Sequence, residues 1–108
     1  QRSKELQIFL ASVDSLGYCM FAIPTVAPIL THFADLINAR YGTTLTEADI
    51  PILGVEAIRN ELEFNRKAGI EPTDIRMPDF VREEALPPSK SVFDVPQEEI
   101  DTIWKDII

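Results

Sequence analysis

Cysteine and histidine each occur once in the 108 residues, and this scarcity limits the metal chemistry of the chain. A single cysteine excludes an internal disulfide. It also excludes a self-contained iron–sulfur cluster, because such a cluster needs about four ligands. A lone histidine excludes the paired-histidine motifs of zinc enzymes. Any cluster bound at Cys19 must therefore take its other ligands from outside this sequence.

Positive charge is also scarce, and long apolar runs are absent. Eighteen acidic residues against ten basic residues give a net charge of -8, which repels nucleic-acid phosphates and anionic membrane surfaces. No run approaches the roughly 18 apolar residues of a membrane span. The first residues do not resemble a signal peptide. We therefore expect a cytoplasmic protein without nucleic-acid or membrane partners.

The length and the hydrophobic content of 45% are enough to bury a core, so we predict a single helical domain over residues 1–108. The chain is small for an enzyme with a large cofactor. It begins with Gln1 rather than Met. We therefore expect it to be a fragment or a processed chain.

The spacing of apolar residues predicts an all-α fold of about four helices. The expected helices cover residues 2–14, 26–41, 47–68 and 96–107. Gly42 and Gly69 follow the second and third helices, where C-terminal caps are needed. The start of the third helix has two interpretations: a capping box from Thr46 to Asp49, or a helix that Asp49 caps beside Pro51.

Residues 70–95 have a different composition. Five of the eight prolines lie between residues 70 and 96, and proline interrupts both helices and central strands. The sequence predicts a proline-rich extended strap that lies over the helices. Its expected apolar anchors are Met77, Phe80, Leu86 and Phe93. Such a long irregular segment is easier to understand on a larger partner surface.

The segment Asp14–Cys19 joins the first predicted helix to an apolar stretch that Pro24 interrupts. We expect a tight loop in which Gly17 adopts positive φ or lets a ligand approach the backbone. Loops held by rigid elements often carry chemistry. In the isolated chain we expect exposed apolar surface over residues 14–24, and a loop that is mobile or engaged in a chain–chain contact.

Three segments resemble the tungsten-containing aldehyde ferredoxin oxidoreductases. Asp14-x-x-Gly17-x-Cys19 is similar to the D-x-x-G-L-C segment in the C-terminal part of that family. Residues 54–69 resemble its G-E-R-I-x-N-L-E-R-x-F-N-x-R-x-G helix. Residues 74–80 resemble its D-x-L-P-x-R-F turn. The resemblance covers roughly residues 10–86, which identifies the chain as a C-terminal domain of this family.

The resemblance implies roles for the loop residues. Cys19 is expected to be one thiolate ligand of a 4Fe-4S cluster and the metal-binding residue of this chain. Asp14 is expected to accept hydrogen bonds from the pterin, and Gly17 and Tyr18 to belong to the same cofactor-binding segment. Tyr18 replaces the family's leucine. The replacement is silent if only its backbone contacts the pterin, and it affects the cofactor if its side chain packs there.

The resemblance also implies an activity for the full-length protein. That protein would hold a tungsten or molybdenum bis-pterin and one 4Fe-4S cluster, and would oxidise aldehydes to carboxylic acids with ferredoxin as electron acceptor. The isolated chain would lack cofactor and activity, because the upstream domains of the same polypeptide supply the other thiolates and the catalytic residues. Relatives that reduce aromatic thioesters give one alternative chemistry. A non-catalytic helical interaction module gives another, with Ile103, Trp104 and Ile107 as its docking face.

Three other polar residues are expected to be structural. His32 falls at the edge of the apolar stripe of the second helix, which predicts a surface or boundary position. Glu61 and Asn65 lie one turn apart and match positions of the family helix. We expect their side chains to hydrogen-bond the strap or a neighbouring domain.

Overall fold

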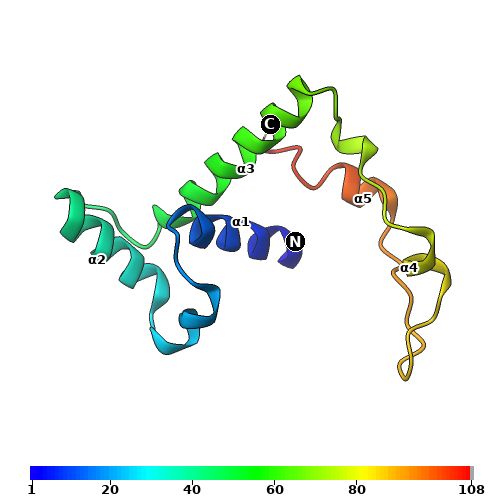
Figure 1. Cartoon of the computed structure of the whole chain (residues 1–108), viewed down its shortest axis with the longest axis horizontal. Coiled ribbons are helices and arrows are strands. Elements are labelled where there is room, and N and C mark those ends of the chain that lie inside the picture. The colour runs from blue at the N-terminus through cyan, green and yellow to red at the C-terminus, as the bar shows by residue number, and fades with distance from the viewer. Residues whose placement is uncertain (108) are drawn as a thin grey trace. The chain divides into compact units, whose positions relative to one another are not determined.

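The computed structural model describes residues 1–107, without the side chain of Pro72 (Figure 1). Its elements are α1 (Arg2–Ser15), η1 (Met20–Thr25), α2 (Ile29–Tyr41), α3 (Ile50–Lys67), η2 (Pro72–Asp74), α4 (Asp79–Glu83) and α5 (Gln97–Asp101), where η marks a 3-10 helix. The only extended pairing in this described part is one antiparallel bridge between Leu86 and Ser91. The prediction of an all-α fold is therefore confirmed. Over the same residues, no helix is long and apolar enough to cross a membrane.

The chain divides into two compact units, Gln1–Glu61 and the residues from Leu62 onward. Each unit is described by itself. The single domain predicted over 1–108 stays a prediction, and its last residue lies outside the described part.

The first unit has a small core where α1, α2 and the start of α3 meet. Its buried residues are Val13, Phe33, Ala34 and Ile50. Partly buried side chains pack around them: Phe9, Leu16, Tyr18, Ile23, Ile29, Leu30, Ile37 and Leu45. Because the core includes residues on both sides of the Asp14–Cys19 segment, it fixes where that segment leaves α1.

The starts of α2 and α3 differ from the predicted ones by three residues. α2 begins at Ile29 instead of 26, because Pro28 disfavours helical backbone at the residue before it. α3 begins at Ile50 instead of 47. The Asp49 carboxylate accepts hydrogen bonds from the Thr46 N–H (2.7 Å) and hydroxyl (2.8 Å), so residues 46–49 form a turn before the helix. The helix starts directly after Asp49, as in the second interpretation, whereas the Asp49 carboxylate bonds back to the Thr46 N–H, as in the first.

The helices end where the glycines predict. α2 ends at Tyr41 and is capped by Gly42, which has φ 68° and donates its N–H to the Asn38 carbonyl. α3 ends before Gly69, which has φ 83°.

In the second unit, the last helix is shorter than predicted. α5 covers Gln97–Asp101 instead of 96–107, and residues 102–107 form successive turns. The Thr102 hydroxyl donates to the Glu98 carbonyl (2.7 Å), and the following backbone bonds span three residues instead of four. Threonine side chains compete in this way with the helix backbone. The apolar spacing of residues 100–107 therefore does not continue the α-helix.

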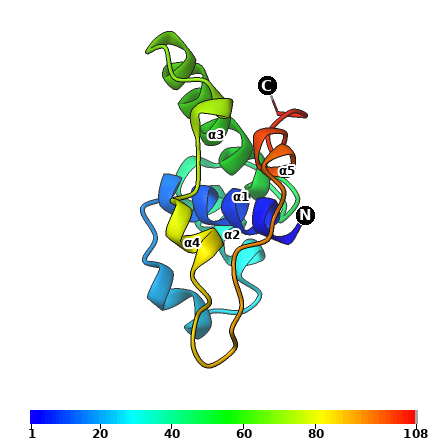
Figure 2. The same cartoon turned by 90° about the vertical axis from the view of Figure 1, so that its right-hand side faces the viewer.

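The proline-rich segment folds back on itself instead of staying extended throughout. It contains η2 and α4, and after α4 it makes a narrow turn and returns to α5 (Figures 1 and 2). Arg82 closes the base of this turn through the Val95 carbonyl (3.1 Å) and the Gln97 side chain (3.2 Å). Of the predicted anchors, Met77 and Phe93 are half-buried, whereas Phe80 and Leu86 are exposed.

Candidate cofactor-binding loop

The Asp14–Cys19 segment begins as the C-terminal cap of α1. Gly17 has φ 64° and donates its N–H to the Asp14 carbonyl (2.9 Å), while the Tyr18 N–H donates to the Val13 carbonyl (3.2 Å). These two bonds form a Schellman motif, which requires a left-handed residue and therefore favours glycine. The predicted positive φ at Gly17 is confirmed. The motif fixes the direction in which the chain leaves α1.

Asp14 lies on the last turn of α1 with an exposed side chain. Its backbone carbonyl is used by the cap, but within residues 1–107 its carboxylate makes no hydrogen bond or ion pair. An ionised carboxylate is an acceptor of hydrogen bonds only. Both oxygens of Asp14 are thus available to donors from outside the chain.

Cys19 follows the cap in an extended conformation and is an exposed free thiol. It directly precedes η1, and the Ala22 N–H donates to its carbonyl (2.9 Å). Met20 is 48% exposed and Phe21 is 84% exposed. The expected apolar surface over residues 14–24 is therefore present. The expected mobility or chain–chain contact of this loop stays a prediction.

Tyr18 is half-buried between exposed neighbours, because its ring packs on the core. The ring centroid lies 4.9 Å from that of Phe33 and 6.0 Å from that of His32, with edge-to-face geometry in both pairs. His32 is half-buried, which confirms the predicted boundary position. Sequence reasoning missed its pairing with Tyr18. The Tyr18 ring is therefore held against the core of the first unit.

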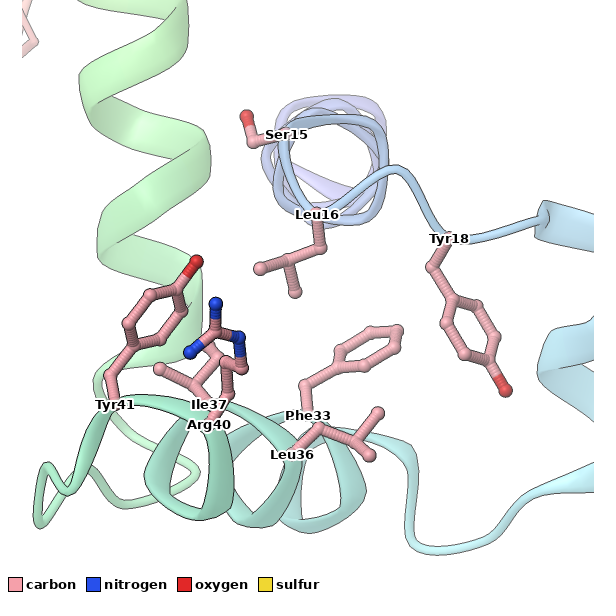
Figure 3. Close-up of a pocket in the computed structure, with 8 residues that line it drawn as sticks. All are labelled: Ser15, Leu16, Tyr18, Phe33, Leu36, Ile37, Arg40 and Tyr41. Carbon is pink, nitrogen blue, oxygen red and sulfur yellow. The ribbon is translucent and has the colours of Figure 1, made fainter.

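A pocket of about 280 Å³ lies beside this loop in the first unit (Figure 3). It is lined by Ser15, Leu16 and Tyr18 together with Phe33, Leu36, Ile37, Arg40 and Tyr41. The sequence analysis did not find it. The sequence signal that could have indicated the pocket is the cation and aromatic pair Arg40-Tyr41 at the end of α2, one turn after the apolar Leu36 and Ile37.

The described residues contain no group of three or more His, Cys, Asp or Glu side chains that could hold a metal ion. Cys19 is an exposed thiol. Its role as one ligand of a metal group stays a prediction.

Glu61 and Asn65 make no side-chain hydrogen bond to the strap within the described residues, and a bond to a neighbouring domain stays a prediction. Glu61 is exposed, and neither side chain bonds to another residue of the described part. The Asn65 backbone carbonyl accepts the N–H groups of Ala68 and Ile70, which close α3. Asn65 thus serves the helix end through its backbone.

Comparison with known proteins shows the family of the chain. The family profile described as "Aldehyde ferredoxin oxidoreductase, domains 2 & 3" matches residues 1–106. The chain belongs to this aldehyde ferredoxin oxidoreductase family. The resemblance of residues 10–86 is confirmed, and the match extends it over α5 and the turns that follow.

One relative within the family is the tungsten-containing aldehyde ferredoxin oxidoreductase of Pyrococcus furiosus. It is 34% identical over 82 residues, which cover 75% of this chain and 13% of the relative. The chain thus spans a small part of the length of this relative. No solved structure matches the chain.

Proposed function

We propose that the chain is part of a tungsten or molybdenum bis-pterin oxidoreductase that oxidises aldehydes to carboxylic acids and passes the electrons to ferredoxin. Family membership and the tungsten-containing relative support the oxidoreductase and the tungsten. In this proposal Cys19 supplies one thiolate to a 4Fe-4S cluster, and Asp14 accepts hydrogen bonds from the pterin. The bound groups supply the redox chemistry when present.

The roles proposed for Asp14 and Cys19 are supported by the exposure of their side chains on either side of the Gly17 cap. The Asp14 carboxylate and the Cys19 thiol are both exposed, and neither is used to hold the fold. Between them, Tyr18 is anchored on Phe33. The loop therefore presents a hydrogen-bond acceptor, the Asp14 carboxylate, and a soft metal ligand, the Cys19 thiolate. Because the cap and the Tyr18 contact hold the backbone between them, a cofactor can bind without rearranging the loop.

The chain contributes one thiolate, and a 4Fe-4S cluster needs about four ligands. We therefore propose that upstream domains of the same polypeptide supply the remaining ligands and the aldehyde site, and that the isolated chain is inactive. A cytoplasmic location is part of the same proposal.

The test is the metal content of the full-length parent, purified without oxygen, beside its Cys19→Ser variant. We expect about four irons per chain, together with tungsten or molybdenum, in the parent, and loss of cluster iron in the variant. Asp14→Asn should lower pterin and tungsten content, because the amide keeps the size but loses the charge. Asp35→Asn, at an exposed position of α2, is the matched control and should keep all metals.

A parent without iron, tungsten or molybdenum would overturn the proposal and favour the non-catalytic interaction module. The docking face suggested for such a module does not match the structure, because Ile107 is 7% exposed and Ile103 and Trp104 are half-buried. The alternative chemistry, reduction of aromatic thioesters, is separated by product analysis of the metal-loaded parent with either substrate.

A further inference from the structure

The pocket beside the Cys19 loop has a chemical character that the proposed function does not use. Its floor is apolar, formed by Leu16, Phe33, Leu36 and Ile37. The side chains of Leu16 and Phe33 project into the space between α1 and α2 (Figure 3). Leu36 is 49% exposed, which is a large exposure for a leucine beside a core. An apolar group that enters the pocket would cover this surface. Its binding would be stabilised because apolar area of both the group and the pocket is removed from water.

The rim of the pocket carries hydrogen-bond donors. Figure 3 shows the Arg40 guanidinium next to the Tyr41 ring and beside Ile37. The Arg40 Cζ lies 5.2 Å from the centroid of that ring, which restrains the guanidinium at the rim. The Tyr41 hydroxyl also lies on this side in Figure 3. The Ser15 hydroxyl donates to the Ala11 carbonyl (2.7 Å) and points away from the space between Leu16 and Phe33 in Figure 3.

Arg40 makes no ion pair with any carboxylate of residues 1–107, although the chain has a net charge of -8. A guanidinium presents N–H groups in a planar fork that matches the two oxygens of a carboxylate. Arg40 is also the only charged residue that lines the pocket. A ligand that complements this pocket would therefore carry one negative charge, placed next to Arg40 at the rim.

Size and shape point to a small molecule as the occupant. A volume of about 280 Å³ is at the lower end of ligand pockets. All lining residues come from two helices and the segment that follows the first, so the pocket is not a long groove that would take a helix or a strand. We propose that it binds a free small-molecule carboxylate with an apolar tail, the carboxylate on Arg40 and the tail over Leu16, Phe33 and Ile37.

The test uses the 108-residue chain and 4-phenylbutyrate, followed by backbone amide NMR. We expect saturable shifts that are largest at Leu16, Tyr18, Ile37 and Arg40, because these residues line the pocket. Arg40→Gln should weaken binding by about tenfold or more, since it removes a charge-assisted hydrogen bond. Arg2→Gln removes the same charge at the start of α1 and should leave the affinity unchanged.

Two further measurements make the result decisive. Tyr41→Phe keeps the ring that faces Arg40 but removes one hydroxyl of the rim, so it should weaken binding less than Arg40→Gln does. 4-Phenylbutanol, which has the tail without the charge, should bind about tenfold more weakly than the acid. Absence of saturable shifts in a chain whose spectrum is well dispersed would overturn the proposal. Equal affinity for the acid and the alcohol, or for the Arg40 and Arg2 variants, would overturn it as well. None of these results depends on a metal or a pterin, so the outcome is independent of the proposed oxidoreductase.

Discussion

The Ser12 hydroxyl accepts a hydrogen bond from the Gly54 N–H (3.1 Å) where α1 and α3 meet, although the two residues are 42 positions apart. The same hydroxyl donates to the Ile8 carbonyl (3.0 Å). Ser12 is the one buried polar residue of the described part and is 1% exposed. A Cβ added at Gly54 would lie 2.1 Å from the Ile8 carbonyl oxygen and 2.6 Å from the Ser12 hydroxyl. The two helix backbones are thus in contact, and glycine is the residue that permits it.

Gly54→Ala should therefore destabilise the chain. In an open helix this change is favourable by about 1 kcal/mol, because alanine has the higher helix propensity. At Gly54 the added methyl meets backbone, which cannot move away as a side chain can, and overpacking costs about 1–3 kcal/mol. Urea unfolding of the two chains measures the difference. An unchanged or higher free energy of unfolding would show that α1 and α3 do not approach as closely as described.

Local features of the sequence predicted local features of the structure. The glycines at 17, 42 and 69 mark helix ends because a left-handed cap depends only on the residue itself and its near neighbours. The Ser12–Gly54 contact was not predictable in this way, since nothing near Ser12 in sequence indicates a partner in α3. The apolar spacing of residues 100–107 predicted a helix that the structure does not contain. Spacing alone does not show that the Thr102 hydroxyl bonds back to the Glu98 carbonyl.

The candidate loop was predictable for a similar reason, and the pocket was not. Asp14, Gly17 and Cys19 lie within six consecutive residues and carry the family resemblance. The pocket instead combines Leu16 and Tyr18 with Arg40 and Tyr41, which come together only when α1 packs on α2. The role of Arg82 was missed likewise, because its partners at 95 and 97 lie across a turn.

Asp49 should titrate below the usual range of an aspartate. The Thr46 N–H and then the Thr46 hydroxyl lower its pKa by stabilising the charged form. A carboxylate whose folded-state pKa is depressed contributes stability above its unfolded-state pKa, and that stability is lost as the pH falls through the folded-state pKa. We therefore expect the chain to lose stability below about pH 4, and to lose less of it in Asp49→Asn.

Asp35→Asn removes another exposed carboxylate of the first unit and serves as the control for that experiment. Urea unfolding between about pH 2 and pH 6 compares the three chains across the aspartate range. A pH dependence that is identical in all three would show that the Thr46–Asp49 turn does not contribute.

Arg82 should hold the folded-back turn of the second unit together. Its guanidinium donates to Val95 and Gln97 and lies 5.3 Å from the centroid of the Phe93 ring. Arg82→Lys keeps the charge but loses the planar fork that reaches two acceptors at once. We expect faster amide hydrogen exchange at Phe93, whose N–H donates to the Val81 carbonyl, and at Leu86, whose N–H donates to Ser91.

The exchange experiment has a matched control in Arg66→Lys, at an exposed position of α3. This variant should leave the exchange of both amides unchanged. Equal acceleration in the two variants would mean that the effect comes from a general loss of stability and not from the bonds of Arg82.

Substitutions of Tyr18 should distinguish a role of its ring in the core from a role at the cofactor. Its ring contacts Phe33 and His32, so Tyr18→Leu, which restores the leucine of the family motif, exchanges one apolar core group for another. We expect the variant to unfold about 1 kcal/mol more easily, and the metal-loaded full-length parent to keep its tungsten content and the EPR spectrum of its reduced cluster. Tyr18→Ala should cost about 2 kcal/mol or more, since it leaves Phe33 without that contact. If the ring instead packed on the pterin, Tyr18→Leu would change tungsten content or the EPR spectrum while the stability of the isolated chain stayed the same.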